Sequence, residues 1–475
     1  MRDQFSLTEL SDSFHRFEAE NGLFDIRVKG RCVWDHLRYE VFEQLVVKRH
    51  GWSAAREKRS YPRILLGILS YGWFRLRWLL LPSPSYEVLL VNTTPGKYLE
   101  GGKRDIHMWP LARALSPHYR VLAFDHNVTA IDPALYPCDV LLTRPAYLFQ
   151  RLKSLFIRFS PSEEEALSDI RRKLKEAFGI EVDVRAIARG NFALQLCLED
   201  FFRWFLGKIR PRMLLYCDNG NVKGMLTAAH ELGVIAVDMQ HGVVSPTHVM
   251  YRYPPGLDMG RIKAALPKRI FTFGTFWNAQ YSLPVRTVAV GSPHFDLQSE
   301  KPFRAPPQER AKRILISSVL LSRGILSELA VELARMLPDH TIYYKLRIDE
   351  YSSWKDHYPP SFRSGGNLVV IENYEKSIYD YFALCRYHVG TNSTTLFEGL
   401  AYGLTTFVLT LGRYEEVLPL IEGGHVFPVK DAAEIKARIG SEPPHPLPPE
   451  AIFRPGSGEN ARLAIADLLE EHPSS

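Results

Sequence analysis

The length, composition and charge of this chain already exclude several classes of protein. Its 475 residues are 46% hydrophobic and 24% charged, which is globular content with enough chain for two or three domains. The net charge of +6 is spread along the chain and, without zinc-knuckle or RNA-recognition motifs, argues against nucleic acid as a partner. The five cysteines show no CxxC spacing and a polar segment follows Met1, so we expect no metal site, no disulfide framework and a cytoplasmic location.

Residues 1–84 predict a helical extension, because apolar side chains recur there at spacings of three and four, with a short hairpin strand expected at 22–30. The segment 61–82 is apolar and aromatic but contains Arg75 and Arg77. Two arginines are costly at the centre of a bilayer, so a spanning helix is disfavoured. Two interpretations remain, namely a helix that lies on an anionic membrane surface and a helix packed on the protein's own surface.

From residue 85 onward, buried strand patterns alternate with helical patterns, which is the signature of parallel, doubly wound sheets. Strands are expected at 87–94, 120–125, 138–145, 213–219, 234–242, 269–274 and 287–296, and in a second series at 313–319, 341–347, 367–373, 387–390 and 405–410. We therefore predict an α/β fold with two Rossmann-like domains that face each other across a cleft.

The domain boundaries follow from the same pattern and from a Pro-rich stretch between the two series. We expect a helical extension at 1–84, an acceptor-side Rossmann-like domain at 85–291, a linker at 292–308, a nucleotide-donor Rossmann-like domain at 309–430, and a Pro-rich tail with a final helix at 431–475.

The stretch from Gly390 to Gly403, GTNSTTLFEGLAYG, resembles the end of a strand followed by a capped helix. Its hydroxyls, on Ser393, Thr394 and Thr395, and the unpaired backbone N–H groups of the helix start predict a site for donor phosphates. Glu398 follows about one and a half turns into the helix, where a carboxylate would reach ribose hydroxyls. The alternative interpretation is an ordinary capped helix with a surface glutamate.

Other strand ends in the second series add candidate ligands for the same donor. Lys345 and Arg347 lie two residues apart, so on a strand they would share one face and stabilise a leaving phosphate, unless they are solvated edge charges. Glu372 and Asn373 follow another strand and are candidates for binding the ribose or the base, with loop capping as the alternative.

The first series offers a candidate general base. His241 follows a strand end, where ligands bind in open α/β sheets, and a histidine with a near-neutral pKa suits removal of a proton from an acceptor hydroxyl. Asp218, at the preceding strand end, would orient His241 or bind acceptor, unless it caps a helix. His248 and His294 are weaker alternatives as the base.

Three further residues are expected on the acceptor side of the site. Gln240 directly precedes His241, and Asp105 and His107 follow the first strand after a Gly-Gly pair. Strand-end loops of this kind line the ligand side of open α/β sheets.

In their order along the chain, the stretches MQHG, VGSPHFD, KLRIDE and GTNSTTLFEGLAYG resemble the GT-B glycosyltransferases of bacterial capsule and lipopolysaccharide synthesis and the related CDP-glycerol glycerophosphotransferase group. The resemblance covers about residues 86–430. It implies a cytoplasmic, metal-independent enzyme without a bound cofactor, whose second domain holds a nucleotide-activated donor and whose first domain holds a glycan or lipid-linked acceptor.

The chain departs from this family at one motif, because related enzymes commonly have Lys-Leu-His-Pro where Lys345 to Ile348 stand. The nucleotide therefore stays open among CMP, CDP, UDP and GDP. Two other activities also stay open, namely transfer of a polyol phosphate from a CDP-linked donor and epimerisation of a sugar nucleotide. A non-catalytic role in polysaccharide assembly is a further alternative.

Overall fold

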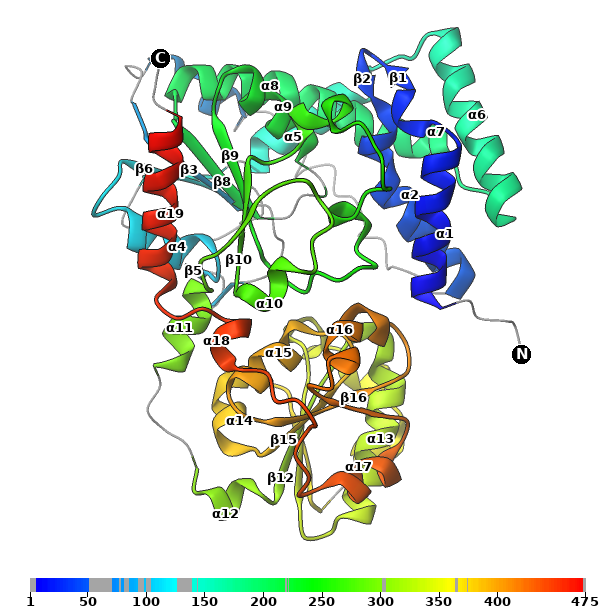
Figure 1. Cartoon of the computed structure of the whole chain (residues 1–475), viewed down its shortest axis with the longest axis vertical. Helices are drawn as coiled ribbons and strands as arrows, with labels where there is room; N and C mark the ends of the chain where they lie inside the picture. Colours follow the sequence, from blue (N-terminus) through cyan, green and yellow to red (C-terminus); the bar gives the residue numbers. More distant parts are fainter. Residues whose placement is uncertain are drawn as a thin grey trace.

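The computed structural model describes residues 6–50, 71–76, 78–80, 85–92, 98–99, 104–125, 139–142, 144–217, 220, 222–300, 305–363, 366–373 and 375–472. These residues form two α/β units, one above the other in Figure 1, and a helical layer beside the first unit. The predicted strand at 138–145 and the predicted end of the strand at 213–219 fall partly outside the described residues.

The first unit is built on a seven-stranded sheet with the order β11-β10-β9-β8-β3-β6-β7, in which every neighbouring pair is parallel. Its strands are β3 (Val88–Asn92), β6 (Val121–Asp125), β7 (Asp139–Leu142), β8 (Met213–Cys217), β9 (Ile235–Met239), β10 (Arg269–Thr272) and β11 (Thr287–Ala289). Helices that flank it include α4 (Met108–Leu115), α5 (Arg144–Ser154), α8 (Ala193–Ile209), α9 (Lys223–Glu231) and α10 (Thr275–Asn278). The central strands β3 and β8 are buried throughout, as expected for a parallel sheet covered on both faces.

The second unit is built on a six-stranded parallel sheet with the order β14-β13-β12-β15-β16-β17. Its strands are β12 (Arg313–Ser317), β13 (Thr341–Lys345), β14 (Leu368–Ile371), β15 (Tyr387–Gly390), β16 (Thr405–Leu409) and β17 (Phe427–Val429). Its helices include α13 (Arg323–Met336), α14 (Ile378–Leu384), α15 (Thr394–Ala401), α16 (Leu418–Glu422) and α17 (Ala432–Arg438). Ala432 and Ile435 of α17 pack in the core of this unit, although they lie past the boundary that the sequence suggests at 430.

Strand order reverses once in each sheet. In the first sheet, β6 and β7 are added on one side of β3, and the later strands β8 to β11 are added on its other side. In the second sheet, β13 and β14 are added on one side of β12, and β15 to β17 on its other side. The loops after such a pair of strands leave in opposite directions, and ligands of open α/β sheets bind in the crevice between them. These two reversal points therefore direct attention to the loops after β3 and β8 and to those after β12 and β15.

Two chain segments join the units. The chain passes down through α11 (Pro293–Ser299) and α12 (Pro307–Arg310), and returns through α18 (Pro449–Ile452) and α19 (Ser457–Glu471) to the first unit (Figure 1). Ile465 and Leu468 of α19 lie in the same buried cluster as Leu90 of β3. Between the units, the indole of Trp277 lies 4.3 Å from the ring of Phe397. The two doubly wound α/β units confirm the predicted fold class.

The predicted N-terminal helices are present as α1 (Leu7–Glu20) and α2 (Val33–His50), joined by a hairpin of β1 (Arg27–Val28) and β2 (Arg31–Cys32). They pack on α6 (Pro161–Phe178), which ends at the C-cap Gly179, on α7 (Val184–Ile187), and on a π-helical turn (Ala188–Phe192) that continues α7 into α8. Buried ion pairs join Arg38 to Glu18 at 2.7 Å and Lys223 to Asp35 at 3.2 Å.

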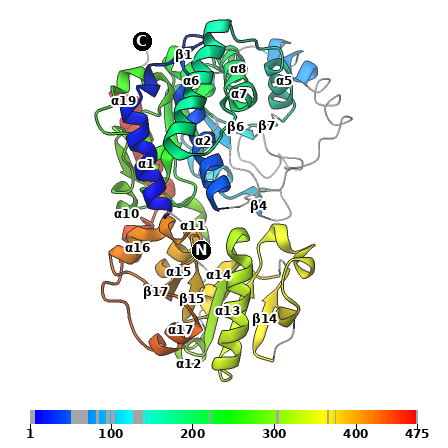
Figure 2. The ribbon, with the colours of Figure 1, turned by 90° about the vertical axis from the view of Figure 1, so that its right-hand side faces the viewer.

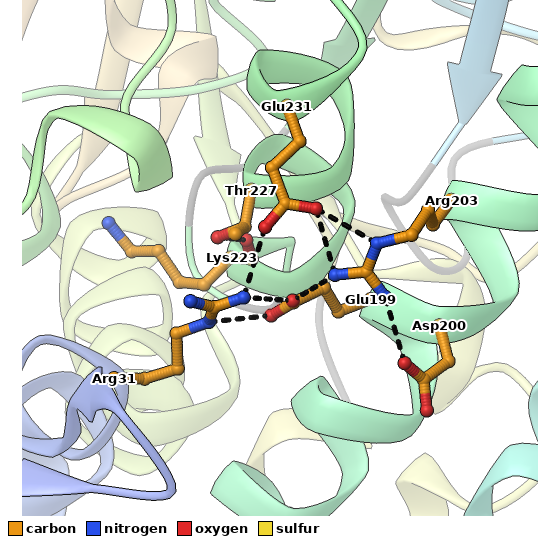
Figure 3. Close-up of polar contacts among 7 residues, drawn as sticks. All are labelled: Arg31, Glu199, Asp200, Arg203, Lys223, Thr227 and Glu231. Atoms are coloured by element: carbon orange, nitrogen blue, oxygen red, sulfur yellow. Dashed lines mark hydrogen bonds and ion pairs between the residues drawn. The ribbon is translucent and has the colours of Figure 1, made fainter.

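A surface ion network fastens the hairpin to the first unit. Figure 3 shows the guanidinium of Arg31 between the carboxylates of Glu199 and Glu231, and Arg203 on the other side of the same two carboxylates. Lys223 points away from this group, toward the buried pair with Asp35. The helical extension is thus held by charged contacts both inside the protein and at its surface.

The helix over residues 71–80 packs on the first unit along one face only. Tyr71 stacks on Phe149 of α5 at 4.4 Å, and Trp78 meets Phe205 of α8 at 5.4 Å. On its other face Trp73 is 69% exposed, and Leu76, Leu79 and Leu80 are also exposed. Within the described part of the chain, no helix is long and apolar enough to span a bilayer. The remaining residues of the predicted segment 61–82, Arg77 included, lie outside the described residues.

Candidate functional site

The predicted donor turn is a strand end, a cap and a helix in the structure. Strand β15 ends at Gly390, and the helix α15 begins at Thr394. Ser393 is the N-cap residue, and its Oγ accepts a hydrogen bond from the backbone N–H of Thr395 at 3.3 Å. Because β15 borders the reversal point of the second sheet, this helix N-terminus lies where an anionic ligand is expected.

A serine that the sequence interpretation missed completes this reversal point from the other strand. Ser317 ends β12, and its Oγ lies 3.2 Å from Oγ1 of Thr395 and 3.0 Å from Nε2 of His388. His388 is fully buried, and burial lowers the pKa of its imidazole to about 3, so the ring is neutral. The sequence could have indicated this residue, because two serines follow the RILI run and place hydroxyls at a strand end, as in the predicted donor turn.

The structure places Lys345 and Arg347 in different surroundings. Lys345 ends β13, and its Nζ donates to Tyr351 Oη at 2.5 Å and to the carbonyl of Asn373 at 3.0 Å. Burial lowers the pKa of this ammonium to about 8. Arg347 lies past the strand end, with a side chain that is 52% exposed and pairs with Asp349 at 3.0 Å. Lys345 is therefore the cation that the fold brings to the strand-end loops.

The three residues predicted to bind ribose or base all lie in the second unit and contact other residues there. Asn373 Oδ1 accepts from the backbone N–H of Glu375 at 3.2 Å, and Glu372 accepts from the indole N–H of Trp354. Glu398 is half-buried on α15 and hydrogen-bonds Tyr379 of α14. Burial first, and then the carboxylate of Glu398, raise the pKa of Tyr379, so this phenol stays protonated.

The predicted general base and one predicted acceptor-side residue lie together in the first unit. The rings of His107 and His241 meet edge to face with centroids 6.5 Å apart, although 134 residues separate them in the chain. Asp105 has a structural contact instead, because its carboxylate accepts the backbone N–H groups of His107 and Trp109, each at 3.0 Å, and that of Met108. Asp105 thus caps the N-terminus of α4, which begins directly after His107.

Gln240 supports the turn that carries His241. Its Nε2 donates to the carbonyl of Gly242 at 2.9 Å, and its Oε1 accepts from the backbone N–H of Phe273 at 2.9 Å. The side chain is almost completely buried. Both ends of the amide bond to backbone, which fixes the loop after β9 against the loop after β10. Asp218, the residue predicted to orient His241, lies outside the described residues.

Of the two weaker base candidates, His294 is buried and His248 is partly buried. Burial, and then the positive charge of Arg413, lower the pKa of His248 to about 4, so it is a poor base at neutral pH. His294 packs against Tyr379 with ring centroids 5.5 Å apart. Val243, two residues after His241, packs against the apolar cluster that includes Phe397 of the second unit. The loop after β9 therefore packs at the junction of the two units.

A cavity of about 490 Å³ lies at the junction of the two units, away from the start of α15. It is bordered by α11, α14, the end of α15 and the returning segment, and its lining includes Phe295, Tyr379, Tyr402 and Phe453. Among the residues that the structure describes, no group of three His, Cys, Asp or Glu side chains is placed to hold a metal ion.

Comparisons with known proteins give likeness in structure only, since the sequence matches no family model and no curated protein. The glycotransferase of kitacinnamycin has 15% identity and a TM-score of 0.48, over 82% of this chain and 96% of that one. The calicheamicin glycosyltransferase CalG4 has 14% identity and a TM-score of 0.49, over 82% of this chain and 100% of its own. The UDP-GlcNAc 2-epimerase of Neisseria meningitidis, bound to UDP-GlcNAc, has 14% identity and a TM-score of 0.47, over 81% and 100% of the two chains.

Proposed function

We propose that this protein transfers a glycosyl group from a nucleotide-activated donor to a glycan or lipid-linked acceptor in the synthesis of a bacterial surface glycan. One observation carries the proposal. The helix N-terminus at Thr394, the N-cap at Ser393 and the hydroxyls of Ser317 and Thr395 converge at the reversal point of the second sheet. Such an array of donors suits the phosphates of a leaving nucleotide.

Lys345 supplies positive charge to the same group of strand-end loops. Its ammonium donates to the backbone carbonyl of Asn373, so the cation and the predicted base-binding loop are in contact. Charge accumulates on the leaving phosphate as the glycosidic bond to it breaks, and a partly desolvated cation stabilises that charge more strongly than one in water. We therefore assign donor binding to the second unit.

The acceptor belongs on the first unit in this proposal. His241 lies on a loop that packs toward the donor unit, and its ring contacts His107. A neutral histidine at this position would take the proton from the attacking acceptor hydroxyl. In the proposed reaction, that oxygen forms the new glycosidic bond, and the bond between the anomeric carbon and the donor phosphate breaks with its electron pair going to phosphate.

An exposed apolar surface on the first unit supports a lipid-linked acceptor and a peripheral location on the inner membrane surface. The helix over 71–80 exposes Trp73 and Leu80, and the turn that follows α5 exposes Leu155 and Phe156, the last by 82%. The α5 helix packs on the helix over 71–80 and bears Arg151 and Lys153 in its last turn. Indole and aliphatic side chains beside cations suit the interface of an anionic membrane.

Binding to vesicles tests the membrane part of the proposal separately. Sedimentation with vesicles of phosphatidylglycerol and phosphatidylcholine should retain the wild type, and a Trp73→Ser, Leu80→Ser variant should bind at least several-fold more weakly. Leu463→Ser is the matched control, because Leu463 is also exposed but lies on α19. Equal retention of the two variants and the wild type would exclude this surface as the membrane contact.

The donor is tested by thermal shift with CMP, CDP, UDP and GDP, since a ligand that binds the native state raises its apparent stability. The preferred nucleotide should stabilise the wild type, and Thr395→Val should lose most of that stabilisation. Incubation of the matching sugar nucleotide with a lipid-linked acceptor should then give a phosphorus-free glycosidic linkage. Loss of transfer in a His241→Ala, Glu398→Ala variant is expected, and full transfer by that variant would remove both residues from the reaction.

The alternatives on the same fold give different products. A product with new phosphodiester phosphorus, seen by phosphorus-31 NMR, would identify transfer of a polyol phosphate. Epimerisation of the donor without acceptor would identify a sugar-nucleotide epimerase. Binding of no nucleotide, together with normal polysaccharide assembly by the His241→Ala, Glu398→Ala variant in cells, would identify a non-catalytic assembly role.

A further inference from the structure

The two residues between the end of β15 and the N-cap are held by a neighbouring loop. Thr391 Oγ1 donates to Asn392 Oδ1 at 2.9 Å, and Asn392 Nδ2 donates to Glu416 Oε2 at 2.8 Å. Glu416 lies in the 3-10 turn η12 (Tyr414–Val417), just after β16. The side chain of Asn392 is thereby fixed directly before the donors of the proposed phosphate site.

The same loop continues to the helical extension of the first unit. Glu416 forms an ion pair with Arg413, and the guanidinium of Arg413 reaches Glu43 Oε1 of α2 at 3.4 Å. Next to it, Glu415 accepts the backbone N–H of Thr8 at 2.5 Å and its hydroxyl at 3.0 Å. In both views of the molecule the start of α1 points toward the second unit (Figures 1 and 2). More than 360 residues separate Arg413 from Glu43, and Glu415 from Thr8.

These charges are shielded from water, which makes their pairing consequential. The side chains of Arg413 and Glu416 are only 19% and 22% exposed. Burial raises the pKa of Glu416, whereas Arg413 first and Asn392 second act to lower it. The loop packs closely against Ser322, because a Cβ at Gly412, whose φ is +70°, would lie only 2.8 Å from Ser322 Oγ. Loss of one charged partner would leave the other buried without its counter-charge.

We infer that Glu43, Arg413 and Glu416 are positioning residues, through which the N-terminal helical extension holds the donor-phosphate turn in its binding geometry. The contacts run from α2 through Arg413 and Glu416 to Asn392, and from there to the backbone that begins α15. This inference rests on the proposed function for its ligand. Its mechanical part, the restraint of the turn by α2, does not depend on which nucleotide binds.

Hydrogen exchange of the peptide that spans 390–396, measured on the full chain without ligand, tests the restraint. Arg413→Gln should increase exchange in this peptide at least several-fold, and Glu43→Gln should do so to a smaller extent. Asp12→Asn is the matched control, since it removes an ion pair of similar length, 2.9 Å to Arg252, that joins α1 to the first unit and does not reach the turn. Unchanged exchange in Glu43→Gln and Arg413→Gln would overturn the inference.

Nucleotide affinity tests whether the restraint matters for binding. With the best of the four nucleotides as the probe, Arg413→Gln should raise Kd about tenfold and Asp12→Asn should leave it unchanged. The exchanged pair Glu43→Arg, Arg413→Glu places a negative charge beside Glu416, so it should not restore affinity, whereas Arg413→Lys should restore part of it. Equal affinity in wild type and Glu43→Gln would overturn the positioning role. Absence of nucleotide binding in the wild type would refute the proposed function, and the exchange experiment would still decide the restraint.

Discussion

Nucleotide binding should weaken as pH rises through the pKa of Lys345. Burial lowers the pKa of this ammonium to about 8, whereas an unperturbed lysine titrates near about 10.4. The group is therefore mostly charged at pH 7 and mostly neutral at pH 9. If the donor phosphates bind the charged form, the apparent Kd rises tenfold per pH unit above the pKa, which gives about a tenfold loss between pH 7 and pH 9.

The linked effect on stability has the opposite direction with pH. Because the folded pKa lies below the unfolded one, the unfolded chain binds more protons between about pH 8 and about pH 10.4. The contribution of Lys345 to the free energy of unfolding therefore rises over this interval, while its contribution to phosphate binding falls. A general alkaline loss of the fold would lower both quantities together, so the two effects can be separated.

Calorimetric titration with the preferred nucleotide diphosphate from pH 7 to pH 9 is the measurement. The terminal phosphate has a pKa of about 6, so it is mostly deprotonated from pH 7 upward and contributes little to the slope. Lys345→Arg keeps the charge throughout and should flatten the pH profile, and Lys345→Met should flatten it at a weaker affinity. A Lys345→Met variant with the same pH slope as the wild type would refute the assignment of this slope to Lys345.

Three further predictions concern the fold around the site. Gly399→Ala should cost about 1–3 kcal/mol in urea unfolding, because a Cβ there lies 2.7 Å from Nδ1 of the buried histidine of β15, whereas Gly207→Ala, in open space on α8, should be neutral or stabilising. Asp35→Asn should cost about 3–5 kcal/mol by leaving Lys223 buried without its counter-charge, measured in the same way. Trp277→Ala should cost about 3–5 kcal/mol and loosen the contact between the two units, measured by unfolding and by small-angle scattering.

The fold was predictable because each sheet is parallel and covered on both faces. Strands in such sheets are continuous apolar runs, and β8 and β16 are buried at every residue, so their sequences differ sharply from those of the helices between them. The predicted strand at 341–347 is two residues longer than β13, which ends at Lys345. The last two predicted residues continue the sequence pattern of the strand, but the backbone there leads into a 3-10 helix that begins at Ile348. Local patterns indicate where strands exist more securely than where they end.

The site was predictable only in part, since strand-end polar residues have two uses. Ser393 and Thr395 could be assigned from capping chemistry, which is local in sequence. Asp105 and Gln240 fit the same rule, yet their side chains bond backbone and support the positions of His107 and His241. No sequence pattern distinguishes a strand-end side chain that meets a ligand from one that meets backbone, because the difference depends on which loop packs beside it.

Arg413 and its partners could not be found in this way, because their contacts join segments more than 360 residues apart and depend on how the two units pack. The available signal was weaker, namely a cation and two carboxylates in LGRYEE directly after the strand at 405–410. Ligands of open sheets bind beyond the carboxyl ends of strands, and this stretch lies at such an end. Its Glu416 side chain nevertheless bonds Asn392 of the turn before α15.

The buried histidine of β15 orients the hydroxyl of Ser317 at the proposed donor-phosphate site. His388 Nδ1 has no hydrogen-bond partner among the described residues, and an unpaired N–H in that position would cost more than an unpaired lone pair. The proton of the neutral ring therefore belongs on Nε2, which donates to Ser317 Oγ. Ser317 Oγ thus accepts from His388 and keeps its own proton for donation, and Thr395 Oγ1 lies 3.2 Å away. When Ser317 donates to Thr395, the hydroxyl proton of Thr395 is available to a phosphate oxygen of the proposed donor, so a histidine that is not itself a proposed ligand would favour an anion at this turn.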